Sequence, residues 1–224
     1  MSAWAVVVAA GEGVRFGKRK AFVTLAGMPM VAHSLITFAK VSAVEGIALV
    51  VPAPQLDEGR TIAAATVPSL RVQVVAGGAS RRESVRAGLT VVPPDTSYVV
   101  VHDAARPLVT VALAEASLAA LENAAGAVVA IPEGDTVKRE RAGVIEETVD
   151  RRGLWRAQTP QAFRAGVLRA AHAQPGGEAT DDAMLVERMG ERVVIVPGDA
   201  GNLKVTTPED LAVAEALIHA RGGF

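Results

Sequence analysis

The chain opens with Ala5-Val6-Val7-Val8-Ala9-Ala10 and continues with Gly11-Glu12-Gly13-Val14-Arg15-Phe16-Gly17-Lys18-Arg19-Lys20. The apolar run is typical of a buried strand, and a glycine-rich, basic segment follows its carboxyl end. Glycines let backbone N–H groups approach an anion closely and adopt positive φ at little cost. The arginines and lysines add positive charge that a glycine loop alone lacks. This stretch therefore predicts an α/β fold with a phosphate-binding loop after its first strand.

The loop matches neither of two common nucleotide-binding fingerprints. The dinucleotide pattern G-x-G-x-x-G needs a glycine where Phe16 stands, and Gly17 comes one position late. The Walker pattern needs Ser or Thr after its lysine, but Lys18 is followed by Arg19. The basic content favours chemistry on the phosphates over binding alone. An NAD-dependent oxidoreductase is therefore a weak alternative.

Composition limits the classes of function. The chain has 224 residues, of which 50% are hydrophobic, enough for one large domain with a substantial core. Its net charge of −1 argues against a nucleic-acid partner, because a general nucleic-acid binder would be strongly basic. The chain has no cysteine, which excludes disulfides, thiolate metal sites and cysteine nucleophiles.

Nothing in the sequence indicates a membrane or secretory segment. No apolar stretch reaches the roughly 18 residues that a membrane-spanning helix needs. The N-terminus leads into the first predicted strand without the charged and apolar regions of a signal peptide. We therefore expect a cytoplasmic protein with no membrane partner.

Short Val- and Ile-rich runs alternate with helical patterns along the chain. The predicted strands are Trp4–Ala9, Gly46–Val51, Arg71–Val75, Tyr98–Val101, Ala127–Ile131 and Arg192–Val196. The predicted helices are Met30–Lys40, Leu56–Thr66, Arg82–Val92, Val111–Asn123, Ala165–His172, Asp181–Met189 and Pro208–Ala220.

This alternation predicts a doubly wound, mostly parallel, Rossmann-like sheet, and we expect residues 1–224 to form a single domain. Ligands of such sheets bind at the carboxyl ends of the strands. Four segments follow predicted strands: the loop from Gly11, the pair Gly77-Gly78, the pair His102-Asp103, and Pro132–Thr136. We expect them to converge on one crevice.

The alternation breaks between about residues 134 and 154, where the chain is polar and charged. Short β-like pieces at Thr136–Lys138 and Val144–Val149 flank a turn at Glu140–Gly143. The segment predicts a β-hairpin arm that protrudes from the domain, and a mobile loop is the alternative. Because an isolated hairpin is marginally stable in water, we expect a second copy of the chain to cover the arm in a homodimer.

A glycine pair introduces the segment Gly77–Ser84 between a predicted strand and helix. Ser80 and Glu83 have the spacing of a capping box, which explains both by helix initiation. The capping box does not account for Ser84, which lies one turn into the helix and is therefore a candidate for contact with a ligand. The pair Arg81-Arg82 is explained at least as well as a solvated surface.

Two polar groups near predicted strand or helix ends are candidates for the site. Asp103 ends a buried strand, a position from which a carboxylate can hold Mg²⁺ near phosphates, although it could also pair with Arg106. His102 is interpreted as structural and not as a base. Thr207–Asp210 predicts a capped helix start, which leaves Lys204 to reach the crevice.

Together these motifs resemble the nucleotidyltransferases with an A-A-G-x-G-x-R loop, and among them the 2-C-methyl-D-erythritol 4-phosphate cytidylyltransferases. Further motifs match that family's pattern in order: Val101–Pro107, Asp135–Lys138, Thr159–Gln161, Thr180–Asp182 and Asn202–Thr206. The resemblance covers nearly the whole chain. Arg19 departs from the family's proline. Among Lys18, Arg19 and Lys20 we take Lys20 as the functional cation, because Ala21-Phe22 follows it as in the family.

The resemblance implies a role for each site residue. Catalytic cations on the CTP phosphates would be Arg15, Lys20 and Lys204. Nucleotide contacts would come from Ala10, Gly11, Gly13, Gly78, Ala79, Ser84 and Ala104. Contacts with the second substrate would come from Asp103, Arg106, Thr136, Arg151 and Thr180. Thr136 and Arg151, on the arm, would act in the other subunit's site, and Asp103 is the candidate ligand of Mg²⁺.

The implied reaction transfers CMP from CTP to methylerythritol phosphate and releases pyrophosphate, in the non-mevalonate route to isoprenoids. A phosphate monoester, with a second pKa near ~6, is mostly a dianion at neutral pH and needs no general base. Fixed cations and Mg²⁺ stabilise the charge that develops on the attacked phosphate. The alternatives are a ribitol 5-phosphate cytidylyltransferase and a nucleotide-binding regulator without catalysis.

Overall fold

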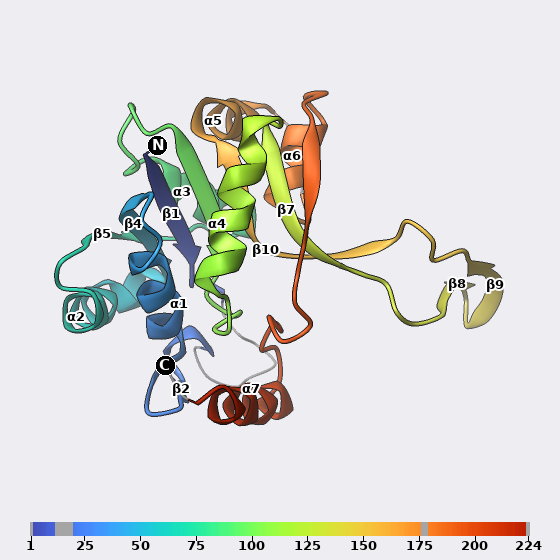
Figure 1. Ribbon diagram of the computed structural model, residues 1–224, viewed down its shortest axis with the longest axis horizontal. Coiled ribbons are helices and arrows are strands. Elements are labelled where there is room, and N and C mark those ends of the chain that lie inside the picture. The colour runs from blue at the N-terminus through green and yellow to red at the C-terminus, as the bar shows by residue number, and fades with distance from the viewer. Residues whose placement is uncertain (1, 12–19, 176–178, 223–224) are drawn as a thin grey trace.

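The computed structural model describes residues 2–11, 20–175 and 179–222. Its centre is a seven-stranded sheet in the order β11-β7-β10-β6-β1-β4-β5 (Figure 1). These strands are β1 (Ala3–Val8), β4 (Val44–Val51), β5 (Arg71–Ala76), β6 (Tyr98–Asp103), β7 (Gly126–Pro132), β10 (Trp155–Arg164) and β11 (Val193–Pro197). Only β10 runs antiparallel to its neighbours in this sheet.

Helices cover both faces of the sheet. They are α1 (Met30–Ala39), α2 (Leu56–Thr66), α3 (Arg81–Leu89), α4 (Val111–Ala119), α5 (Ala165–Ala173) and α6 (Asp182–Glu187), whereas α7 (Pro208–Ala220) packs in a separate cluster. The side chains of α1, α2 and α4 share one core with Ala5 and Val7 of β1. Those of α3, α5 and α6 share another with Trp4 and Val6. Successive strand residues point to opposite faces, so the sheet is doubly wound, as predicted.

The six predicted strands and seven predicted helices are confirmed, but some bounds differ. Helix α3 ends at Leu89 and not at Val92, and α4 ends at Ala119, where a 3₁₀ turn takes over. Strand β10 was not predicted. Pro160 lacks a backbone donor for a sheet ladder, which argues against a central strand. The structure accommodates it where the pairing register of β10 with β7 shifts, between Ala157 and Gln161.

The predicted arm is a two-stranded antiparallel hairpin of β8 (Val137–Arg141) and β9 (Val144–Val149). Its turn is narrower than predicted: Ala142 and Gly143 adopt φ of 52° and 82°, the left-handed region of a tight hairpin turn. The hairpin lies between β7 and β10 in the chain and projects away from the sheet and its helices (Figure 1).

Helix α7 packs against the segment that contains Lys204 and fixes its position. Its Ala214 and Ile218 pack with Val205 and with the short hairpin of β2 (Thr24–Leu25) and β3 (Met28–Pro29). The backbone N–H of Val205 donates to Ala105 O, just beyond β6, over 2.8 Å. The predicted helix start is confirmed as a capping box between Thr207 and Asp210. Within the described ranges, no helix has the length and apolar content to cross a bilayer.

Candidate active site

A cavity of about 590 Å³ opens at the carboxyl ends of β1, β4, β5 and β6, and we call it the cleft. Strand topology brings these ends to one edge of the sheet, where parallel α/β proteins bind ligands. The cleft is lined by nine of the predicted site residues: Ala10, Gly11, Lys20, Gly78, Ala79, Ser84, Asp103, Ala104 and Lys204. The segment Pro132–Thr136, which was predicted to converge with them, does not line it.

Asp103 is enclosed by two cations. The ammonium of Lys204 donates to its Oδ2 over 2.7 Å, and Nε of Arg81 donates to its Oδ1 over 3.0 Å. Burial by itself would raise the pKa of Asp103, but Arg81 and Lys204 hold it well below its usual range. The carboxylate therefore stays ionised in the cleft, a hard oxygen ligand next to two positive charges.

His102 is structural, as predicted. Its Nε2 lies 3.1 Å from Arg106 O, which as a carbonyl accepts, so Nε2 carries the proton. Its Nδ1 then accepts from the Thr159 hydroxyl, 3.0 Å away, whose oxygen accepts from the backbone N–H of Asp103. Burial lowers the pKa of His102 to about 4, so the ring is neutral at physiological pH. This chain of hydrogen bonds fixes the end of β6.

The wall of the cleft formed by Gly77–Ser84 is packed too closely for larger residues. A Cβ on Gly77 would lie 2.4 Å from the Cβ of Ala10, and one on Gly78 would lie 2.4 Å from the Cβ of Glu83. The predicted capping box between Ser80 and Glu83 is confirmed. The Ser84 hydroxyl accepts from Gly78 N–H over 3.2 Å and donates to Ser80 O over 2.9 Å. Ser84 thus braces the backbone at the cleft wall.

Comparison with known proteins identifies the family. The family model described as "IspD: 2-C-methyl-D-erythritol 4-phosphate cytidylyltransferase" matches residues 3–220. The chain belongs to this family. It is 46% identical to the 2-C-methyl-D-erythritol 4-phosphate cytidylyltransferase of Chromobacterium violaceum over 226 residues, covering 98% of this chain and 99% of the relative. It is 44% identical to that of Geobacter metallireducens over 228 residues, covering 97% and 98%.

Solved structures of family members share the fold. The 4-diphosphocytidyl-2C-methyl-D-erythritol synthase of Anaerococcus prevotii superposes with a TM-score of 0.86 at 27% identity, over 97% of this chain and 98% of that one. The 2-C-methyl-D-erythritol 4-phosphate cytidylyltransferase of Thermus thermophilus superposes with a TM-score of 0.80 at 32% identity, over 98% and 100%. Both the fold class and the family resemblance predicted from the sequence are therefore confirmed.

Four residues that the cytidylyltransferase pattern assigns to the second substrate lie outside the cleft wall. The guanidinium of Arg106 donates to Asn202 O and Ala157 O, and the partners of Asp103 are Arg81 and Lys204 instead of Arg106, the alternative that the sequence left open. Thr180 lines a different cavity. Thr136 precedes β8 and is exposed, as is Arg151, which donates to Gly134 O at the base of the arm. Arg15 and Gly13 lie outside the described residues.

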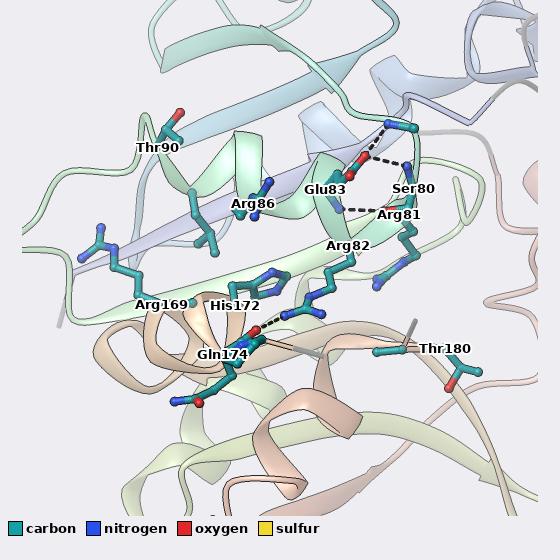
Figure 2. Close-up of a pocket in the computed structure, with 15 residues that line it drawn as sticks. Ser80, Arg81, Arg82, Glu83, Arg86, Thr90, Arg169, His172, Gln174 and Thr180 are labelled. Atoms are coloured by element: carbon teal, nitrogen blue, oxygen red, sulfur yellow. Dashed lines mark hydrogen bonds between the residues drawn. The ribbon is translucent and has the colours of Figure 1, made fainter. Parts of the chain in front are cut away.

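Arg81 was not among the predicted site residues, because a solvated surface explains the pair Arg81-Arg82 at least as well from the sequence. The Arg81 side chain is only 25% exposed and bridges Asp103 and Asp182. Its neighbour Arg82 instead donates to Gln174 O, in the second cavity of about 1100 Å³ between α3 and α5, which both arginines line (Figure 2). Two adjacent arginines look alike in the sequence. The sequence does not show that one of them, Arg81, pairs with two carboxylates that are distant along the chain.

Proposed function

We propose that this protein transfers CMP from CTP to 2-C-methyl-D-erythritol 4-phosphate and releases pyrophosphate. The product is 4-diphosphocytidyl-2-C-methyl-D-erythritol, a precursor in the non-mevalonate route to isoprenoids. Membership of the cytidylyltransferase family over residues 3–220 carries this proposal. The cleft supports it, because it places two lysines and a carboxylate beside a glycine-rich wall. The relatives do not favour the ribitol phosphate alternative.

The chemistry requires electrostatic stabilisation more than proton transfer. The acceptor's phosphate dianion attacks the α-phosphorus of CTP, a bond to the bridging oxygen breaks, and pyrophosphate leaves with that electron pair. Lys20 and Lys204 stabilise the charge on the phosphates during this step, with Arg15 as a third cation. Lys204 must exchange its partner Asp103 for the α-phosphate, and its 42% exposed side chain is placed to make that exchange.

A divalent cation, Mg²⁺, fits the chemistry of the cleft. Mg²⁺ is commonly bound by one or two carboxylates together with substrate phosphates and waters. Asp103 offers one ionised carboxylate on the cleft wall, and no cluster of three His, Cys, Asp or Glu occurs in the part of the chain described. Asp103 would therefore hold the ion together with the triphosphate. When bound, Mg²⁺ neutralises phosphate charge and orients the leaving group.

We further propose that the protein is a cytoplasmic homodimer with the arm at its interface. Val144 and Ile145 near its tip are 67% and 60% exposed, and Trp155 at its base is 41% exposed. A two-stranded hairpin gains stability when another surface covers its apolar side chains. We infer that a second copy of the chain provides that surface, and that Thr136 and Arg151 bind the methylerythritol phosphate in the partner's cleft. Residues 1–224 then act as a single domain whose site is completed by its copy.

Pyrophosphate release tests the function directly. Each nucleoside triphosphate is incubated with Mg²⁺ and either methylerythritol phosphate or ribitol 5-phosphate. We expect release only from CTP with methylerythritol phosphate. Release with ribitol 5-phosphate alone would change the acceptor, and CTP binding without release from either acceptor would favour the regulator.

A further inference from the structure

A chain of polar contacts leads from the cleft into the protein interior. Lys204 contacts Oδ2 of Asp103 over 2.7 Å, and Oδ1 of Asp103 accepts from Nε of Arg81 over 3.0 Å. Nη1 of Arg81 donates to Oδ2 of Asp182 over 2.7 Å. Oδ1 of Asp182 lies 2.9 Å from Nε2 of His172. These groups come from five separate segments of the chain, so only the tertiary fold assembles them.

The inner end of this chain is buried. The side chains of Asp182 and His172 are 1% and 2% exposed, whereas that of Lys204 is 42% exposed. Removing charged groups from water costs free energy that an apolar pair would not cost, so a buried ion pair is poor evidence for a stabilising role. Its retention calls for another explanation, such as the fixing of one conformation.

Among the described residues, the one hydrogen-bond partner of the His172 side chain is Asp182. Its Nδ1 is buried and has no hydrogen-bond partner among the described residues. A buried, unsatisfied nitrogen is destabilising, so a leucine would suit packing at this position better. Figure 2 shows His172 and Arg81 among the residues that line the second cavity. We therefore take the role of the imidazole to be its hydrogen bond to Asp182.

Arg81 is held at two points of its planar group. Nε contacts one carboxylate and Nη1 contacts the other, which fixes the plane of the guanidinium. With Asp182 oriented by His172, Arg81 stays on Oδ1 of Asp103 and shares its negative charge. If Arg81 moved away, Asp103 would hold the ammonium of Lys204 more strongly and keep it from the phosphates.

We propose that His172 and Asp182 are positioning residues, which act through Arg81 to set how readily Lys204 leaves Asp103 for the nucleotide. This proposal rests on the proposed function, since it assigns Lys204 to the α-phosphate. It makes a buried histidine on α5 a determinant of turnover in a cleft that it does not line.

The test compares His172→Leu, which removes the donor, with His172→Gln, whose amide keeps one near the position of Nε2. We expect His172→Leu to lower kcat about tenfold, and His172→Gln to stay within about twofold of the wild type. Arg86→Gln, on the second cavity wall but outside the chain of contacts, is the matched control and should leave kcat unchanged. Equal losses in the Leu and Gln variants, or no loss in either, would overturn the proposal.

A double-mutant cycle separates positioning from instability. In a Lys204→Ala background, His172→Leu should lower kcat/KM by less than about twofold, because the residue that it acts through is gone. A purely structural effect would give the same fold-change in both backgrounds. If His172→Leu fails to fold, Arg81→Lys replaces it, since an ammonium keeps the charge but cannot span both carboxylates.

A measurement without substrate distinguishes failure of this proposal from failure of the proposed function. Acetylation of Lys204 by acetic anhydride, followed by mass spectrometry, reports how tightly Asp103 holds the ammonium. We expect slower acetylation in His172→Leu than in the wild type and no change in His172→Gln. An unchanged rate in His172→Leu would contradict the proposal whatever the enzyme's substrates are.

Discussion

In the cleft, Asp103 lies between Arg81 and Lys204 and its side chain is 12% exposed. On the arm, Arg139 pairs with Glu147 over 2.6 Å, and these side chains are 61% and 53% exposed. Ion pairs of the same kind are therefore buried in the cleft and exposed to solvent on the arm. Buried pairs orient groups because each partner constrains the next, whereas solvent-exposed pairs contribute little. The cleft is ordered by contacts within one chain, whereas the arm would gain its contacts from a second copy in the proposed dimer.

The largest expected effect is on the cleft's cations. Lys204→Ala and Lys20→Ala should each lower kcat by about 10²–10³, the usual loss for one donor that stabilises a transition state. The fold should persist in Lys204→Ala, because Arg81 still pairs with Asp103, although the melting temperature should fall somewhat. Steady-state pyrophosphate release and thermal unfolding measure both. Full activity in both variants would rule out the cleft as the catalytic centre.

Lowering the pH should lower the free energy of unfolding through protonation of His102. Its pKa is lowered to about 4 in the folded state, against about 6.5 when unfolded. The unfolded chain therefore binds a proton more readily, and stability falls as pH drops from about 6.5 to about 4, by about 3 kcal/mol in all. Urea unfolding of the wild type and of His102→Gln at both pH values isolates this contribution. The variant should lose less stability than the wild type, and an equal loss in both would contradict the prediction.

The arm's dependence on a second copy is tested at its tip. Ile145→Asp should weaken the dimer at least about tenfold, since burial of one such side chain is worth about 1.5–3 kcal/mol. Ile145 is 60% exposed, so the central sheet should remain folded. Sedimentation equilibrium gives the dissociation constant and circular dichroism the fold. Val213→Asp, at a 52% exposed position of α7, is the control and should leave the dimer intact.

A smaller effect is expected for the acceptor contact at the base of the arm. Arg151→Ala should raise KM for methylerythritol phosphate about tenfold, the loss typical of a hydrogen bond to a charged group. KM for CTP and kcat should change little, because the cleft residues are untouched. Arg139→Ala serves as a control for general loss of positive charge on the arm. If both variants give the wild-type KM, the arm does not bind the acceptor.

The smallest effect is expected for the surface ion pair of the arm. Glu147→Gln should change the free energy of unfolding by less than about 1 kcal/mol, because exposed pairs are screened by water and salt. Denaturant titration at low and high salt measures it. A larger loss would mean that this pair is shielded from solvent, as it would be inside a dimer interface.

Much of the fold was predictable because its signals are local. Apolar runs such as Val99–Val101 mark central strands, and Thr207 with Asp210 marks the start of α7. The cleft was predictable for the same reason, since many of its residues directly follow strands. The topology rules then bring those strand ends to one edge.

The rest was not local. Strand β10 carries Pro160 in the middle of a sheet, where the pairing register with β7 shifts. The partners of Arg81 are 22 and 101 residues away in the chain. Spacing does not encode such contacts, so Arg81 resembled a surface residue and Arg106 resembled the partner of Asp103.

The anchoring of the arm bears on how the family can diversify. Pro132 at the end of β7 pairs directly with Trp155 at the start of β10, and Glu133 N–H donates to Leu154 O over 2.9 Å. The arm thus begins and ends at one pair of neighbouring residues on two adjacent strands of the sheet. A segment attached in this way can lengthen, shorten or be exchanged as a cassette without shifting either strand. On the proposed function, changes in the acceptor or in assembly could therefore arise in the arm without altering the cleft.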